Sequence, residues 1–334
     1  KSIKALQDGF DLECGRNEAE KEGSQAESIQ TFMKYSKWNY KVFYSLHCIS
    51  IIAILRYFLK GYGISAGAVL WIDGKVASGK TQLAITMGDF FNRDGGLSKQ
   101  IKHLHTTKAK AKVITEELIK YKNAVLILDD IKKEETVRNR ENAKNITDLL
   151  IRSIYTGKIG EAGIEEEEIE ATAIITGEFF KEIDSTISRV LYLNIDNFLQ
   201  EKENSVQFRE IQTDKYYLAK FISYFIQWLL KKMEMGEGQE FFSKIYMNLQ
   251  QEVSQSFHGE LNTRIVETVT NFQLVSEILN IYFEENGVFS KDRVAFWEDS
   301  KKALKDLGEA TLNKCLGYNP FIEICFIEIL PELK

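Results

Sequence analysis

Short apolar runs alternate with amphipathic stretches through the middle of the chain. The runs are AVLWID, AVLILDD, ATAIITGE and VLYLNID, and all of them fall between residues 61 and 197. Runs of this length separated by helical periodicity are typical of a parallel sheet covered by helices. On either side, apolar residues recur every three or four positions, as in helices. The pattern predicts an α/β fold with a helical N-terminal region at 1–60, a core with a central parallel sheet at 61–197 and a helical C-terminal domain at 198–334.

The composition is that of a globular protein with more than one domain. The chain has 334 residues, of which 44% are hydrophobic and 28% are charged, enough for two or three packed domains. The formal charge of −6 argues against a protein that coats nucleic acid by bulk positive charge. A local basic channel is compatible with this charge, so the charge does not decide the partner.

The cysteines and the most apolar segment predict a cytoplasmic protein without membrane contact. CISIIAIL is interrupted by Arg56 and is shorter than the ~20 residues that a membrane span needs, so we expect a buried helix there. The cysteines lie far apart without the spacing of a zinc site, and we expect reduced, buried thiols. They are Cys14, Cys48, Cys315 and Cys325.

The stretch GKVASGKT, residues 74–81, has the pattern G-x-x-x-x-G-K-[ST] between a predicted strand and a predicted helix. Its glycines let the loop curl so that backbone N–H groups point at phosphate oxygens, and the start of the next helix adds positive potential. We expect Lys80 to reach the β- and γ-phosphates and the Thr81 hydroxyl to bind Mg²⁺. The alternative is a glycine turn without a ligand. The expected nucleotide contacts are Gly74, Lys75, Val76, Ala77, Ser78, Gly79, Lys80 and Thr81.

A second element, AVLILDD, ends in two carboxylates. This pattern is expected of a central strand whose carboxyl end holds Mg²⁺ beside the phosphates. Asp129 is expected to bind the metal, directly or through water, and Asp130 to orient or deprotonate the attacking water. The alternative is that the two residues cap the next helix. Together the two motifs predict a site for ATP or GTP with Mg²⁺.

Two polar residues stand next to the later apolar runs. Thr176 follows ATAII and is a candidate sensor of the γ-phosphate beside Asp129, with a strand-end threonine as the alternative. Arg189 comes immediately before VLYLNID. In ring ATPases an arginine near this point reaches across the subunit boundary and stabilises charge on the neighbour's γ-phosphate. This role requires an oligomer, and the alternative for Arg189 is a surface salt bridge.

The succession of GKVASGKT, LILDD, LLIRSIYTGKIGEAG, AIITGE and SRVLYLNID over residues 65–197 resembles the AAA+ ATPase core of replication proteins from bacterial mobile elements. These relatives are the MCM-like helicases of staphylococcal cassette elements, the replication initiator-helicases of phage satellites and related transposon ATPases. The resemblance covers less than half of the chain. It implies a P-loop AAA+ fold in a hexameric, ATP-driven DNA helicase that moves on single-stranded DNA. The residues that it implies are nucleotide contacts at 74–81, acidic catalytic positions at Asp129 and Asp130, a polar sensor at Thr176 and an arginine finger at Arg189.

The chain departs from this family in one segment. Such helicases typically carry a basic hairpin into the central pore, whereas the segment between IYTGKIG and ATAIITGE contains the acidic run from Glu165 to Glu170. Lys158 is the remaining candidate for a DNA-phosphate contact, with an ordinary exposed lysine as the alternative. A few lysines per subunit suffice, because several subunits converge on one strand.

Other conspicuous residues favour ordinary roles. His103 and His105 have no third metal ligand near them in the sequence. The aromatic residues of YYLAKFISYFIQWLL have the spacing of a helix core. Arg264 stays open as a lid arginine over the phosphates.

Two other classes of function stay open. A regulatory or defence ATPase would act as a nucleotide-dependent switch on a protein partner, with slow turnover that DNA does not change. A P-loop phosphotransferase would need an acceptor pocket within the monomer and no arginine from a neighbour.

Overall fold

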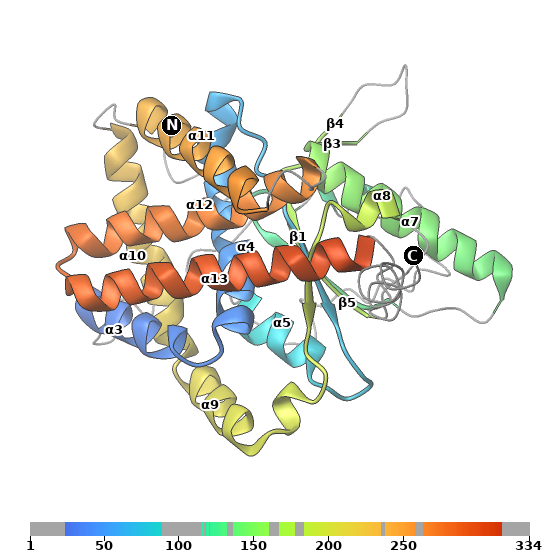
Figure 1. Ribbon diagram of the computed structural model, residues 1–334, viewed down its shortest axis with the longest axis horizontal. Coiled ribbons are helices and arrows are strands. Elements are labelled where there is room, and N and C mark those ends of the chain that lie inside the picture. Colours follow the sequence, from blue (N-terminus) through green and yellow to red (C-terminus); the bar gives the residue numbers. More distant parts are fainter. Residues whose placement is uncertain are drawn as a thin grey trace, which may run out of the picture.

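The centre of the molecule is a parallel sheet of four strands in the order β2, β5, β1, β6 (Figure 1). The computed structural model describes residues 24–88, 115–116, 118–119, 121–131, 136–159, 167–177, 184–234, 238–257 and 263–315. The four strands are β1 (Val69–Asp73), β2 (Val125–Ile131), β5 (Thr172–Gly177) and β6 (Leu191–Asn194). Each coincides with one of the apolar runs, so the predicted α/β fold with a central parallel sheet and helical flanks is confirmed.

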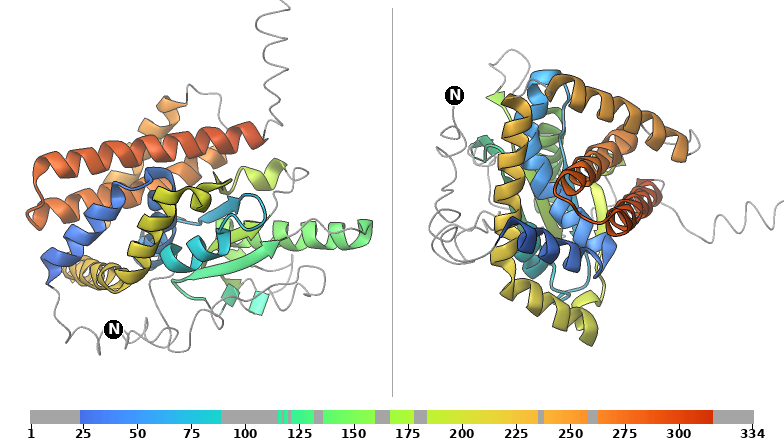
Figure 2. Two further views of the ribbon diagram at one scale, coloured as in Figure 1. Left: turned by 90° about the horizontal axis from the view of Figure 1, so that it is seen from below. Right: turned by 90° about the vertical axis from the view of Figure 1, so that its left-hand side faces the viewer.

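The two faces of the sheet carry different helical layers (Figure 2). Because successive side chains of a strand point to opposite faces, Leu70 and Ile72 pack on one layer, whereas Val69 and Trp71 pack on the other. A sheet buried on both faces needs strands that are apolar throughout, which explains the unbroken runs. The first layer includes α4 (Tyr40–Leu59) and α5 (Lys80–Gly88), and the second includes α7 (Val137–Thr156).

The helices from the two ends of the chain share one core. Phe32 stacks on Phe221 with ring centroids 4.1 Å apart, and Phe283 lies 5.9 Å from Phe32. The Gln25 amide donates to Asn286 at 2.7 Å. Because the N-terminal and C-terminal helical regions share this core, the fold does not separate them at 60/61 and 197/198. These domain boundaries stay predictions. The helices concerned are α3 (Gln25–Ser36), α10 (Lys215–Glu234), α12 (Thr263–Glu285) and α13 (Ser290–Cys315).

A small second sheet and several further helices complete the fold. The strands β3 (Lys158–Ile159) and β4 (Glu167–Glu168) form an antiparallel pair that contains part of the acidic run. The other elements are η1 (Lys60–Tyr62), α8 (Asp184–Ile187), η3 (Phe198–Gln200), α9 (Lys202–Thr213) and α11 (Gly238–Ser256).

Helix α4 is the central helix of the larger core. It begins after Asn39, whose side chain accepts a hydrogen bond from the Val42 N–H at 3.1 Å. Together with η1 it is long and apolar enough to cross a membrane, and 94% of its most apolar window is buried inside the protein. The helix extends on both sides of CISIIAIL, so its length exceeds the expectation from that run alone. Its burial makes it a core helix, as predicted.

Candidate functional site

The loop of residues 74–79 turns from the carboxyl end of β1 into α5. The turn uses left-handed backbone at Ala77, with φ of 61°, and at Gly79, with φ of 91°. A residue with a Cβ would be strained at this φ of Gly79, and its Cβ would lie 2.3 Å from Leu199 Cδ1, so the leucine side chain would also have to move. The loop therefore leads tightly curled backbone into a helix N-terminus, as a phosphate site requires.

The Lys80 side chain folds back over this loop. Its Nζ donates to the carbonyl oxygens of Gly74 at 2.6 Å and Lys75 at 2.9 Å. An ammonium group is a compact charge on a flexible stem. Phosphate oxygens can therefore replace these two carbonyls as its acceptors without a change in the backbone.

Three polar side chains from three elements meet at the carboxyl edge of the sheet. Asp129 Oδ1 accepts the Thr81 hydroxyl at 2.6 Å and the Thr176 hydroxyl at 2.5 Å. Asp129 is 6% exposed, and Thr176 is fully buried. A hydroxyl and a carboxylate are oxygen ligands that Mg²⁺ accepts, usually completed by water and substrate phosphates. The structure thus brings together the residues predicted for metal and γ-phosphate.

A β-bulge aims Asp129 toward this edge. The pairing of β2 with β5 shifts between Leu128 and Ile131, so that β2 carries one extra residue. Bulges disrupt a ladder locally and redirect side chains, often next to functional sites. A Cβ on Gly177 would lie 2.2 Å from the Ile131 carbonyl oxygen, which explains glycine at this close approach. Asp130 belongs to the same bulge, but its side chain lies outside the described part of the structure.

A second polar cluster holds the start of the phosphate loop. Asp73 accepts the Tyr192 hydroxyl at 2.5 Å and the Gly74 N–H at 2.8 Å, and Asp196 accepts the Lys75 N–H at 2.7 Å. Burial, with the bond to Asp73, raises the pKa of Tyr192 above its usual range, so the hydroxyl stays a donor. These contacts were not predicted. Tyr192 and Asn194 alternate on one face of β6, and Asp196 follows two residues later in the turn after the strand, a spacing that the sequence contained.

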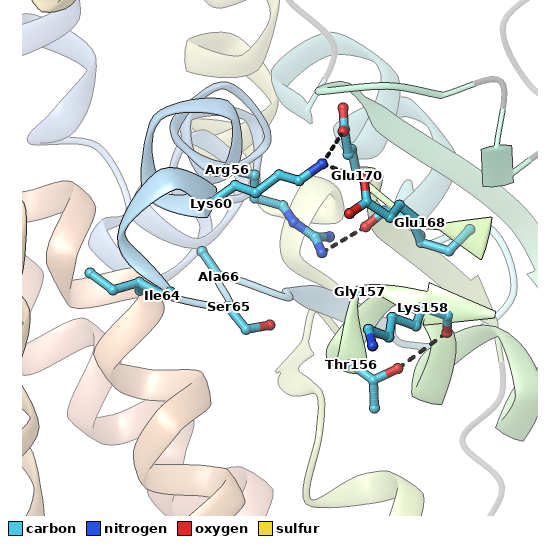
Figure 3. Close-up of a pocket in the computed structure, with 12 residues that line it drawn as sticks. Arg56, Lys60, Ile64, Ser65, Ala66, Thr156, Gly157, Lys158, Glu168 and Glu170 are labelled. Atoms are coloured by element: carbon cyan, nitrogen blue, oxygen red, sulfur yellow. Dashed lines mark hydrogen bonds and ion pairs between the residues drawn. The ribbon is translucent and has the colours of Figure 1, made fainter. Parts of the chain in front are cut away.

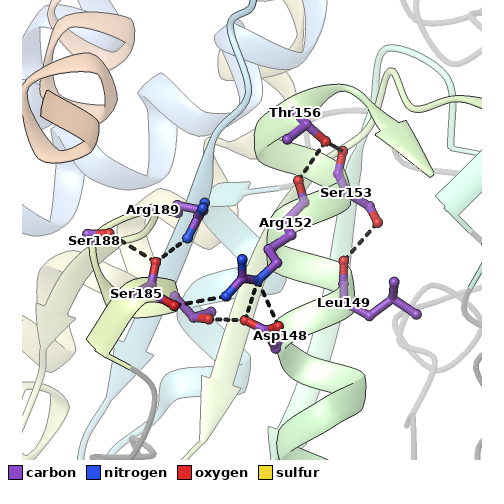
Figure 4. Close-up of polar contacts among 9 residues, drawn as sticks. Asp148, Leu149, Arg152, Ser153, Thr156, Ser185, Ser188 and Arg189 are labelled. Carbon is purple, nitrogen blue, oxygen red and sulfur yellow. Dashed lines mark hydrogen bonds and ion pairs between the residues drawn. The ribbon is translucent and has the colours of Figure 1, made fainter. Parts of the chain in front are cut away.

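Arg189 lies at the opposite edge of the sheet, before β6 (Figure 4). Since β6 runs parallel to β1, the length of a strand separates Arg189 from this chain's own phosphate loop. Its Nη1 donates to the Ser185 carbonyl, and its guanidinium carbon lies 5.5 Å from the Tyr155 ring centroid. Burial lowers the pKa of Arg189, and the charges of Arg264 and Arg152 add to this effect. Arg264 therefore lies near Arg189 at this edge.

A pocket lies at the base of the β3–β4 hairpin and shares no lining residue with the phosphate loop (Figure 3). Lys60 pairs with Glu168 and also lies 3.2 Å from a Glu170 oxygen. Lys158 stands opposite Glu168 in the ladder, so its charge faces a carboxylate. The segment between the two strands, 160–166, lies outside the described residues. The role of Lys158 as a DNA contact stays a prediction.

Arg56 anchors this hairpin to α4. It is 8% exposed and donates through Nη2 to the Ile169 carbonyl at 2.9 Å and through Nη1 to the Ala171 carbonyl. Burial lowers the pKa of Arg56 to about 10, so it stays charged at neutral pH. The residue that interrupts the apolar segment in the sequence thus satisfies two backbone carbonyls.

The described residues contain no group of three or more His, Cys, Asp or Glu side chains that could hold a metal ion. A Mg²⁺ ion at Thr81 and Asp129 fits this finding, because Mg²⁺ is usually bound by one or two carboxylates together with phosphates. Cys48 is buried, which raises the pKa of its thiol to about 12. Cys14, Cys325, His103 and His105 lie outside the described residues.

Comparison with known proteins bears on the fold. No protein-family model and no curated protein matches the chain. Its structure is similar to a solved structure described as "SCCmec type IV Cch - active helicase", with a TM-score of 0.57 and 14% sequence identity. The match covers 88% of this chain and 52% of that chain. This protein therefore shares with that helicase an α/β core flanked by helices, over about half of the helicase's length.

Proposed function

We propose that this protein is an ATP-hydrolysing motor of the AAA+ type that works as a ring. The observation that carries the proposal is the meeting of the Thr81 and Thr176 hydroxyls on one oxygen of Asp129, beside the curled loop that ends at Lys80. A Mg²⁺-nucleotide site needs this set of groups at the carboxyl edge of a parallel sheet.

Each residue has a separate task in this proposal. The backbone of residues 74–81 holds the phosphates, and Lys80 moves from its two carbonyl acceptors to phosphate oxygens. Thr81 and Asp129 hold Mg²⁺, which neutralises charge on the β- and γ-phosphates when it is bound. Thr176 fixes the Asp129 carboxylate next to the γ-phosphate. Asp130 orients the attacking water or takes its proton.

Arg189 completes the site of a neighbouring subunit. It lies a strand length away from the phosphate loop of its own chain, so it cannot reach a nucleotide bound there. A guanidinium carries a permanent charge in a planar fork of donors, which suits it to stabilise charge that develops on a transferred phosphoryl group. The ATP site is therefore shared between subunits, and we propose a hexameric ring.

We further propose that the ring is a cytoplasmic DNA helicase or replication ATPase of a mobile genetic element. The likeness of its fold to that of an active helicase supports this assignment. Changes at the subunit interface during hydrolysis would move the β3–β4 hairpins along single-stranded DNA, with Lys158 as the phosphate contact.

Steady-state ATPase rates test this proposal. We would measure wild type, Lys80→Ala and Arg189→Ala over a range of protein concentrations, with and without single-stranded DNA. The wild-type rate per subunit should rise with concentration and with DNA. Each variant alone should be inactive, and a mixture should regain activity, because a Lys80→Ala subunit can offer Arg189 to the intact site of its neighbour. A flat rate per subunit and no recovery on mixing would overturn the shared site.

A regulatory switch is the second candidate, favoured by one observation. Strand β4 exposes Glu167 and Glu168 where a hairpin that contacts DNA would expose basic residues. In the same experiment, slow turnover that recovers on mixing but does not respond to DNA would favour a protein partner over DNA.

A further inference from the structure

The guanidinium of Arg189 is held by uncharged groups. The residue is 7% exposed, its Nη1 donates to the Ser185 carbonyl, and its carbon Cζ lies over the Tyr155 ring at 5.5 Å from the centroid. Within the described residues its Nε is buried without a hydrogen-bond partner. Burial and the nearby charges of Arg264 and Arg152 lower the pKa of Arg189, against a smaller opposite effect of Tyr155 and Asp148. Arg189 makes no ion pair within the described part of the chain, so its position is set by what packs around it.

One side of this support is the short helix α8. Asp148 Oδ1 and Oδ2 both accept from Arg152 Nε at 2.7 Å, and Asp148 also accepts the Thr186 hydroxyl. Arg152 in turn donates through Nη2 to Ser185 Oγ at 2.8 Å (Figure 4). These bonds tie α8 to α7. They fix the backbone at Ser185 whose carbonyl accepts from Arg189.

The other side is Tyr155, in the last turn of α7. Its hydroxyl donates to Glu267 Oε2, which belongs to α12 of the helical bundle. Burial raises the pKa of Tyr155 above its usual range, and the bond to Glu267 adds to this effect, so the hydroxyl remains a donor at neutral pH. A ring held at its far end by a carboxylate cannot swing away from the guanidinium that lies over its face.

We propose that Tyr155 and Glu267 are positioning residues for Arg189, through which α12 sets the orientation of the arginine that each subunit offers to its neighbour. This inference rests on the proposed function of Arg189 in a shared ATP site. An arginine that arrives already oriented adds its charge without a loss of side-chain entropy at the moment of reaction. The C-terminal helices of one subunit thereby contribute to ATP hydrolysis in the neighbouring subunit.

The test measures kcat and the ATP-analogue Kd of Tyr155→Leu, Tyr155→Phe, Glu267→Ala and Glu267→Gln. Tyr155→Leu should lower kcat about ten- to a hundredfold, as expected for a misplaced catalytic group. Tyr155→Phe and Glu267→Ala break the same bond, so they should cause equal, smaller losses, and the double variant should be no worse than either. Glu267→Gln keeps an acceptor and should restore the rate. The Kd should stay at the wild-type value throughout, because each variant keeps its own phosphate loop.

Mixing distinguishes positioning from a general structural defect. Tyr155→Leu should regain activity with Lys80→Ala, which supplies an intact Arg189, and should not regain it with Arg189→Ala. Tyr35→Phe is the matched control, since its hydroxyl also donates to a carboxylate, Asp214 Oδ2 at 2.5 Å, outside this cluster, and its kcat should be unchanged.

Each further outcome has one meaning. If Arg189→Ala recovers with Lys80→Ala but Tyr155→Leu does not, or if the Tyr155 and Glu267 variants keep the wild-type kcat, the positioning role is overturned and the shared site stands. If Arg189→Ala itself fails to recover, the shared site is wrong and the positioning role is overturned with it.

Discussion

The Thr176 hydroxyl donates to Asp129 Oδ1 at 2.5 Å, across the boundary between two neighbouring strands of the sheet. Hydrogen bonds from a hydroxyl to a carboxylate are short and about twice as strong as neutral ones. Thr176 is fully buried, so water does not compete for this bond. The contact holds the carboxylate at the bulge of β2, in the orientation that the proposed metal site requires.

Thr176→Val removes this hydroxyl while keeping the shape of the side chain. We expect kcat for ATP hydrolysis to fall about 10- to 100-fold, the range typical when a group that orients a metal ligand is lost. The apparent affinity for Mg²⁺ should weaken in the same titration. Thr176→Ser keeps the hydroxyl and should retain most activity. Equal rates for wild type and Thr176→Val would remove Thr176 from the site.

Gly79→Ala should weaken nucleotide binding. The added Cβ meets Leu199 Cδ1 at 2.3 Å, and the residue has a φ of 91°, so the backbone is strained and either the loop or Leu199 must shift. Gly287→Ala is the control, because Gly287 has a φ of 74° with nothing within 4 Å of the added Cβ. The control should lose about 1 kcal/mol of stability from backbone strain and bind nucleotide normally. Titration of a fluorescent ATP analogue measures nucleotide binding by both variants. Normal binding by Gly79→Ala would contradict the loop's role.

Arg56→Met should destabilise the protein by about 2 to 3 kcal/mol, because the Ile169 and Ala171 carbonyls lose a charged donor in a buried place. Arg56→Lys keeps the charge but cannot reproduce the fork of donors, so its loss should be smaller. Urea unfolding with an unchanged m-value is the appropriate measurement. A change in stability below about 0.5 kcal/mol, the range of ordinary surface substitutions, would show that the anchor is unimportant.

The protein should become less stable as the pH is lowered, because His47 is kept neutral in the folded protein. The ring is buried, which lowers its pKa from 6.5 to about 3 in the folded protein, and its Nδ1 lies 2.8 Å from the Phe43 carbonyl oxygen. The unfolded chain takes up a proton below pH 6.5 whereas the folded protein does not, so protons favour unfolding between these two pKa values. We expect a loss of roughly 1 kcal/mol per pH unit below about pH 6.

His47→Leu removes this titration and leaves the carboxylates unchanged. As the pH is lowered from 6 to 4, wild type should therefore lose stability relative to His47→Leu, by roughly 1 kcal/mol per pH unit. A difference that stays constant over this range would mean that His47 is protonated in the folded protein as well.

Local pattern was enough to predict the elements of the site. The apolar runs became strands because their residues must be buried on both faces, and the glycines of GKVASGKT became the loop because only glycine adopts the backbone needed at position 79. Thr81 and Asp129 were predicted to meet because the carboxyl ends of parallel strands share one edge of a sheet. The position of a residue at the carboxyl end of a strand can be read from the neighbouring sequence alone.

The sequence by itself determined which segments are strands and helices, since that depends on side-chain periodicity and backbone preference within a few residues. The sequence left Thr176 either beside Asp129 or as an ordinary threonine at a strand end, and only the tertiary structure, which places β5 between β1 and β2, decided that it bonds to Asp129. It also placed Tyr192 on Asp73 and Glu267 on Tyr155. The last two contacts join residues more than a hundred positions apart. Their formation depends on how whole layers pack, a cooperative outcome that no local pattern encodes.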